Sequence, residues 1–251
     1  MKYNLISDPK INFKASKNLK LNVKTYFLSL MPSDLSGYNV CPMANKVTKK
    51  ENNKNKSDCS SNCVAFNGKG RFDVVKNARI RKTKMFFENK DLFMEQLVFD
   101  IFKGINQAKK EGFEPSFRLN AYSDIKWEKI KISSFGNATI FELFPNVIFY
   151  DYTKNLNRLV PKNYELTYSH WGNWKHTNSQ IKNGLNVAMV FDKRQELPKK
   201  YKGTKVVDGD KNDLRTTKND GKKVIVGLRA KMSFKNIDIE LQKKKSFVVV
   251  A

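Results

Sequence analysis

The stretch KDLFMEQLVFDIFKGINQAKKEGFEPSFRLNAY, residues 90–122, shows the pattern that decides the fold. Its first part carries apolar side chains at four-residue steps, at Phe93, Leu97, Ile101 and Ile105. This spacing predicts an amphipathic helix over 90–110, which the glycine at position 112 would end. Residues 116–122 then have the length and composition of a strand. A helix that leads into a strand in this way is typical of a βαβ unit.

Five other short runs have strand character, and three have helical character. The predicted strands are 25–30, 146–152, 164–169, 186–191 and 223–230, and the predicted shorter helices are 124–132, 138–143 and 177–183. Alternation of strands and helices favours right-handed crossovers and a parallel sheet. We therefore expect one α/β domain over residues 1–251, with a mostly parallel six-stranded sheet that curls into a partial (βα)6 barrel.

Two polar segments interrupt this pattern. Residues 47–58 are lysine-rich and lack periodicity, which predicts a flexible polar insertion. Residues 193–205 are basic and contain Pro198, which predicts an exposed loop. The tail at 243–251 joins a lysine run to an apolar end, and it either adds an edge strand or remains frayed.

The three cysteines of the chain, Cys41, Cys59 and Cys63, all follow the first predicted strand. An odd number of cysteines in one early loop favours a metal or iron–sulfur site over a disulfide framework. Three thiolates can hold a [4Fe-4S] cluster and leave one iron open. Two alternatives stay open: a zinc site completed by a distant histidine, and three unrelated buried thiols.

The charge of the chain is strongly positive. Its 48 lysines and arginines stand against 24 acidic residues, which gives a formal net charge of +24. A polyanionic partner such as nucleic acid fits this excess, although an AT-rich genome would also enrich lysine. The sequence lacks a long apolar run and a signal-peptide core, so we expect a soluble cytoplasmic protein with no membrane partner.

Polar residues follow three of the predicted strands. Ser123 and Asp124 follow the second strand, Tyr152 and Lys154 end the third, and His170 follows the fourth. Parallel sheets display functional groups at the carboxyl ends of their strands, so these residues are candidates for a shared site. Each also has a simpler reading, such as a helix N-cap for Ser123 and Asp124 or a solvated lysine for Lys154.

Two further clusters have alternative explanations. One cluster contains two tryptophans and a lysine, at Trp171, Trp174 and Lys175. It is either a surface on which unpaired bases stack or a loop that caps the core. Three carboxylates lie close together in the sequence, at Asp208, Asp210 and Asp213, and could bind a hard cation. Alternatively, Gly209 lies between the first two and allows them to form a tight turn.

Several of these motifs together resemble the phage gene product 88 family. They are CPMA at 41–44, CSSNC at 59–63, the strand leading to Ser123 and Asp124, FYDYTK at 149–154 and VIVGLRAK at 224–231. The resemblance implies a phage or mobile-element protein in the host cytoplasm, without an assigned activity. The chain departs from the family at Val64, where an aromatic residue is usual, and at Ser123-Asp124, where Ser-Gly-Asp is usual.

An architectural resemblance to radical S-adenosylmethionine enzymes concerns the cofactors. It implies that Cys41, Cys59 and Cys63 ligate three irons and that Ser123 and Asp124 accept the amine of S-adenosylmethionine. The catalytic candidates, from their places at the strand ends, are Tyr152, Lys154 and His170. The cysteine spacing is much longer than in those enzymes, so the likeness is one of fold and ligand number. The expected function is radical chemistry on nucleic acid or a nucleotide. The alternative is a non-catalytic nucleic-acid-binding protein with zinc-bound or free cysteines.

Overall fold

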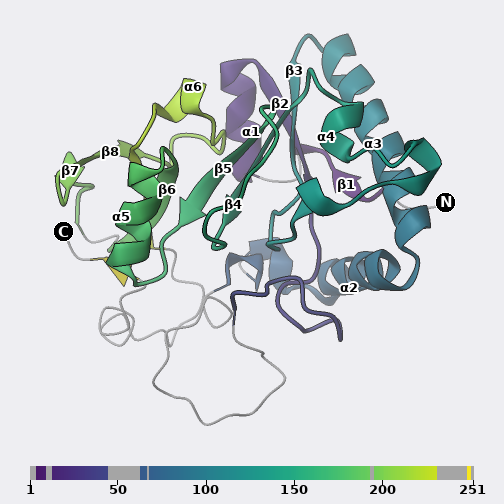
Figure 1. The fold of residues 1–251 in the computed structure, drawn as a ribbon, viewed down its shortest axis with the longest axis horizontal. Coiled ribbons are helices and arrows are strands. Elements are labelled where there is room, and N and C mark those ends of the chain that lie inside the picture. The colour runs from purple at the N-terminus through teal and green to yellow at the C-terminus, as the bar shows by residue number, and fades with distance from the viewer. Residues whose placement is uncertain are drawn as a thin grey trace.

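The computed structural model describes residues 4–9, 13–44, 63–66, 68–192, 195–230 and 248–249. These residues form one ten-stranded sheet in the order β1-β2-β3-β4-β5-β6-β9-β8-β7, with β10 paired to β6 (Figure 1). The strands are β1 (Ile6–Ser7), β2 (Val23–Leu28), β3 (Glu114–Arg118), β4 (Ile148–Thr153), β5 (Tyr164–Ser169), β6 (Asn186–Phe191), β7 (Lys200–Tyr201), β8 (Thr204–Asp208), β9 (Ile225–Arg229) and β10 (Val248–Val249).

The predicted parallel α/β sheet is confirmed, but its extent differs from the prediction. Every neighbouring pair from β2 to β8 along the sheet is parallel, and the outermost pairs β1–β2 and β7–β8 are antiparallel. The sheet has ten strands instead of six because short runs at both edges and at the C-terminus also pair. Among the described residues the path ends at β1 and β7, so the sheet is not a closed barrel and the (βα)6 arrangement is not confirmed.

Helices connect most of the central strands. They are α1 (Phe13–Ser16), α2 (Asp73–Glu88), α3 (Lys90–Lys110), α4 (Ile140–Leu143), α5 (Trp174–Lys182) and α6 (Thr217–Asp220). Figure 1 shows α3 and α4 beside the β2–β3 part of the sheet and α5 beside β6. The helix predicted at 90–110 is confirmed with the same bounds, and its repeating apolar residues Phe93, Leu97 and Ile101 are fully buried.

The two faces of the central strands differ: one packs in the apolar core, and the other carries buried polar side chains. On one face of the central strands, Tyr26, Phe117 and Phe149 pack in series within the main core cluster. On the other face, Thr25 and Ser116 share a hydrogen bond of 2.7 Å, and the Tyr150 hydroxyl donates to Thr25. This alternation follows from the two-residue period of a strand.

Two predictions about local structure need correction, and of the two alternatives for the tail the formation of a strand is confirmed. Residues 124–132 contain only a 3-10 turn, Trp127–Lys129, because the Asp124 side chain binds another loop instead of capping a helix. Residues 193–205 contain β7 and the start of β8, so this basic segment is not simply a loop. The apolar tail contributes β10, which pairs with β6 where β5 has ended.

The predicted insertion at 47–58 lies outside the described residues. Within the described ranges, no helix combines the length and the apolar composition that a membrane span needs.

Candidate functional site

The loops that follow β2 and β3 lie against each other at the carboxyl edge of the sheet. The Asp124 backbone N–H donates to the Val40 carbonyl at 2.8 Å. The Cys41 thiol lies 3.5 Å from the Tyr122 carbonyl oxygen, to which it donates, and it accepts from the Ser33 backbone N–H at 3.3 Å. The structure therefore brings Cys41 next to the Ser123–Asp124 segment, as parallel strand order predicts.

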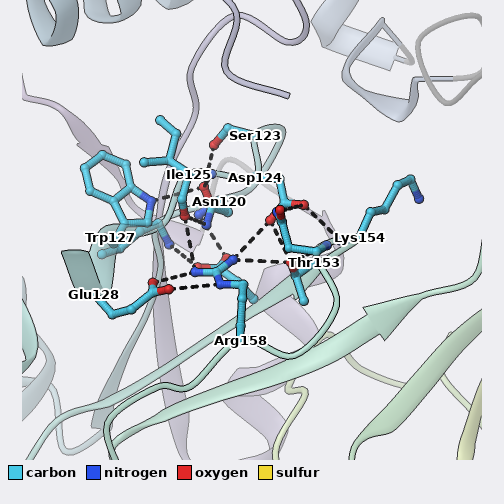
Figure 2. A network of polar contacts seen from close by, with 12 residues as sticks. Asn120, Ser123, Asp124, Ile125, Trp127, Glu128, Thr153, Lys154 and Arg158 are labelled. Atoms are coloured by element: carbon cyan, nitrogen blue, oxygen red, sulfur yellow. Dashed lines mark hydrogen bonds and ion pairs between the residues drawn. The ribbon is translucent and has the colours of Figure 1, made fainter. Parts of the chain in front are cut away.

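Asn120 organises the loop after β3. Its side-chain oxygen accepts hydrogen bonds from the Ser123 hydroxyl, the Ile125 backbone N–H and the Trp127 indole, at 2.8 to 3.0 Å. Its amide nitrogen donates to the Ile125 carbonyl at 2.9 Å. Figure 2 shows these contacts converging on one buried side chain. They fix the turn that presents Tyr122, Ser123 and Asp124.

Asp124 joins this loop to the loop after β4. One carboxylate oxygen accepts from the Thr153 hydroxyl at 2.8 Å and from Arg158 at 3.1 Å. The other accepts from the Lys154 backbone N–H at 2.8 Å and from the Asn155 amide at 2.9 Å (Figure 2). Two carboxylate oxygens offer about four acceptor positions, so this geometry uses the whole capacity of the group.

Arg158 connects Asp124 to Glu128. Its guanidinium binds Glu128 through two parallel hydrogen bonds, 3.1 Å from Nε and 2.6 Å from Nη2. The same group reaches Asp124 with Nη1, and its side chain is only 2% exposed. This fork geometry is the strong form of an arginine–carboxylate pair. The loops after β3 and β4 are therefore locked together.

These contacts bear on the cofactor role predicted for Ser123 and Asp124. The Ser123 hydroxyl is used by Asn120, and each Asp124 oxygen already accepts twice. An ammonium group of a cofactor would have to displace one of those donors. In this arrangement the two side chains hold the loops and do not fit the role of amine acceptors.

A second cysteine, Cys63, lies in the same neighbourhood. It immediately precedes the turn Val64–Phe66, where Arg79 of α2 donates to the Ala65 carbonyl at 2.7 Å. The Arg79 guanidinium also stacks on the Tyr122 ring, 4.4 Å from its centroid. Burial lowers the pKa of Arg79, and the nearby Tyr122 and Cys63 side chains oppose that shift. Contacts thus run from Cys41 through Tyr122 and Arg79 to the Ala65 carbonyl, two residues after Cys63.

The third cysteine, Cys59, lies outside the described residues. In the described part of the chain, no group of three or more histidine, cysteine, aspartate or glutamate side chains is placed to hold a metal ion. The predicted site of three cysteines therefore remains a prediction.

Lys154 and His170 lie at the ends of the next strands. The Lys154 ammonium donates to the Ser169 hydroxyl at 2.8 Å, one residue before His170. Both His170 ring nitrogens have partners, since Nδ1 lies 2.6 Å from the Thr177 hydroxyl and Nε2 accepts from the Gly172 N–H. Burial, with the charges of Lys154 and Lys202, lowers the pKa of His170 to about 4. His170 is therefore a neutral ring that holds the start of α5.

Tyr152 lies on the face of β4 that points away from Asp124. It occupies the opposite face of β4 from Thr153, and the Arg118 guanidinium lies 5.1 Å above its ring. Burial raises the pKa of Tyr152 to about 12, so its hydroxyl stays protonated at neutral pH. The structure does not bring Tyr152 together with Asp124, which binds Thr153 on the other face.

The tryptophans at the start of α5 are half-buried. The Trp171 indole donates to the Tyr168 hydroxyl at 2.9 Å, and Trp174 packs edge-on against Tyr201. The Lys202 ammonium lies 4.7 Å over the Trp174 ring, and Lys175 is exposed. The two tryptophans are therefore partly packed against the core, and two lysines, Lys175 and Lys202, lie beside them.

The three aspartates at 208–213 belong to two different contacts. Arg229 pairs with Asp208 and Asp210, and the Asp210 backbone N–H donates to Asp208, which is the geometry of a turn. Asp213 instead pairs with Arg118 at 2.6 Å. Arginines balance all three carboxylates, so the tight turn explains this motif better than a cation site.

Sequence reasoning missed Asn120, Glu128 and Arg158, which carry the centre of the network. Asn120 follows β3 and could have been found by its position. Arg158 gives no such signal, because it lies in the connection between β4 and β5 and meets Asp124 only in three dimensions.

Comparison with known proteins agrees with the early resemblance at the level of the family. No curated protein and no solved structure matches this chain. The model of the family described as Gene product 88 matches residues 6–249, almost the whole length, including every described strand. The chain therefore belongs to the gene product 88 family.

Proposed function

We propose that this protein carries a thiolate-ligated iron–sulfur cluster at the carboxyl edge of its sheet and acts on nucleic acid. The observation that carries the proposal is the contact path from Cys41 through Tyr122 and Arg79 to the Ala65 carbonyl, two residues after Cys63. A shared metal centre would require the Cys41 and Cys63 thiolates to converge beside these loops. Cys59 supplies the third thiolate in this proposal.

The nature of the ligands favours iron–sulfur over zinc. A structural zinc site needs four closed positions, and three cysteines leave one unfilled. His170 would be a natural fourth ligand, but Thr177 and Gly172 already occupy its ring nitrogens. A four-iron cluster held by three thiolates keeps one open iron, which can bind and activate a small ligand. The proposal does not extend to S-adenosylmethionine, because Asp124 has no acceptor position left for its amine.

Lys154 is the candidate acid–base group in this proposal. Its ammonium lies half-buried at the same sheet edge, on the residue whose backbone N–H binds Asp124. An ammonium group suits a proton donor or a contact to phosphate.

The colour of the protein tests the cluster. Protein purified without oxygen should be brown and absorb broadly near about 400 nm, as thiolate-bound iron does. Cys41→Ser, Cys59→Ser and Cys63→Ser should each remove most of the absorbance and the bound iron and sulfide. His170→Gln is the matched control for the zinc alternative and should leave the iron content unchanged. A colourless wild type with stoichiometric zinc, or with no metal, would reject the cluster.

Binding to a single-stranded oligonucleotide tests the partner. The logarithm of affinity should fall with the logarithm of salt concentration, with a slope of about −0.7 per phosphate contact, and Lys175→Ala should reduce that slope by about one contact. Trp174→Ala should cost roughly 1–3 kcal/mol if a base stacks there, without changing the slope. Phe102→Ala, which removes an exposed ring on α3, is the matched control and should have no effect. If the affinity for the oligonucleotide does not change with salt concentration, nucleic acid is removed from the proposal.

A further inference from the structure

A cavity of about 140 Å³ lies on the polar face of the sheet, where β5 runs beside the start of β6. Glu165 and Thr167 of β5 line it, and the register of β5 on β4 places both on the same face as Tyr150. Arg215 and Thr217, from the connection between β8 and β9, form the opposite wall. An engineered cavity of roughly 150 Å³ holds a benzene molecule, so this one has room for about six non-hydrogen atoms.

Thr167 brings an unpaired hydroxyl to this cavity. The residue is only 2% exposed and lines the cavity, and its hydroxyl has no hydrogen-bond partner among the described residues. The other threonines buried in the sheet and helices do use their hydroxyls, as at Thr25, Thr83, Thr153 and Thr177. A buried hydroxyl is costly without a partner, so this one points to a group that enters the cavity.

Glu165 brings an unbalanced carboxylate to the same wall. It is half-buried, and its Oε2 atom accepts from the Thr217 backbone N–H at 2.7 Å. Within the described part of the chain, no lysine, arginine or histidine forms an ion pair with it. Two carboxylate oxygens offer about four acceptor positions, so Glu165 keeps most of its capacity, whereas Asp124 uses all of its own.

Arg215 does not cancel the charge of Glu165. Its Nη1 atom pairs with Asp220 at 3.3 Å, and its Nη2 atom donates to Asn212. The wall therefore carries the negative charge of Glu165, which favours a cation. A hard metal ion needs several oxygen ligands, and no group of three or more histidine, cysteine, aspartate or glutamate side chains is placed to hold one in the described ranges. A cation that donates hydrogen bonds fits better.

We propose that this cavity binds a small primary amine as its ammonium ion. An ammonium group has three donors and no acceptor, which matches the free positions on the Glu165 carboxylate and the Thr167 hydroxyl. The two residues are two apart on one strand and so lie on the same face. The net charge of +24 repels cations in general, so binding depends on this local geometry and not on overall attraction. The inference does not rest on the proposed cluster.

Calorimetric titration of the full-length protein with butylamine tests the proposal. Butylamine should bind at least about tenfold more tightly than n-butanol, which lacks the charge, and than tetramethylammonium, which lacks N–H donors. Spermidine distinguishes two sources of the same chemistry. Butylamine that binds as tightly as spermidine supports a free small amine, and tighter binding of spermidine supports the ammonium end of a longer polyamine.

Two variants assign the binding to the cavity. Glu165→Gln keeps an oxygen for the Thr217 N–H but loses the charge, so it should weaken butylamine binding at least about tenfold. Thr167→Val keeps the shape and should also weaken binding, but it should leave stability to denaturant unchanged because its hydroxyl has no partner within the described chain. Glu95→Gln, which changes an exposed carboxylate on α3, is the matched control and should bind as the wild type does.

Several results would overturn the proposal. They are a wild type that binds neither amine, equal affinities for butylamine and n-butanol, and displacement of butylamine by potassium chloride at matching concentrations. Unchanged binding in both Glu165→Gln and Thr167→Val would place the amine elsewhere and overturn it as well. If Glu165→Gln fails to fold, Thr167→Val decides: weaker binding supports the proposal, and unchanged binding overturns it.

Discussion

Replacing Arg158 with alanine is expected to lower the free energy of unfolding by about 3–5 kcal/mol, because it leaves buried carboxylates without their partner. Glu128 would lose both of its parallel hydrogen bonds, and Asp124 would lose one of four. The Glu128 side chain is 4% exposed and cannot recover this loss from water. Chemical denaturation of the wild type and of Arg158→Ala under the same conditions measures the difference.

The control is an ion pair of the same charges on the surface. Lys131 and Glu142 lie 3.2 Å apart, with both side chains 56% exposed, so Lys131→Ala should change stability very little. Arg158→Lys provides a second comparison, since it keeps the charge but cannot form the two-pronged contact to Glu128. Equal losses in Arg158→Ala and Lys131→Ala would contradict the role of the network.

Elements with a simple apolar pattern were predicted well. The bounds of α3, β5 and β6 agree with the sequence pattern because their buried faces are apolar almost throughout. Helix α2 was missed for the opposite reason. Two of the three residues that it buries are Arg79 and Thr83, so its inner face carries no apolar stripe.

The candidate site was predictable only in part. The order of parallel strands was enough to place Cys41 beside Ser123 and Asp124, since each follows a strand at the same edge. The face on which a strand residue lies depends on register, and a shift of one residue reverses it. For that reason Tyr152 was grouped with Asp124, although its ring packs with Arg118 on the face of β4 opposite to Thr153, which binds Asp124.

Replacing Asp213 with alanine should cost a similar 3–5 kcal/mol, because Arg118 would then be a buried cation without a close partner. The two side chains lie 2.6 Å apart and are 12% and 5% exposed, whereas the next carboxylate, Asp151, is 3.9 Å from Arg118. The Asp213 backbone N–H also donates to Asn18 at 2.8 Å, so the loop after β8 is held to the segment before β2. Denaturation of Asp213→Ala measures the loss.

The double variant Arg118→Met with Asp213→Leu is the matched control for this pair. Apolar residues of similar volume often replace a buried ion pair without loss, so the double variant should recover most of the stability that Asp213→Ala loses. A double variant as unstable as Asp213→Ala would mean that packing, not charge, explains the effect.

The two predictions together distinguish the two faces of the sheet. Arg158 holds the loop that presents Tyr122 to Cys41, so, if the proposed cluster is present, Arg158→Ala should lower the iron content of protein that remains folded, as well as its stability. Asp213 lies with Tyr150 and Arg118 on the polar face, so Asp213→Ala should lower stability alone. Iron content measured per folded molecule in both variants checks this. Equal losses of iron would show that the content of the proposed cluster follows only global stability. The contacts between the loops at the carboxyl edge would then have no specific role in holding it.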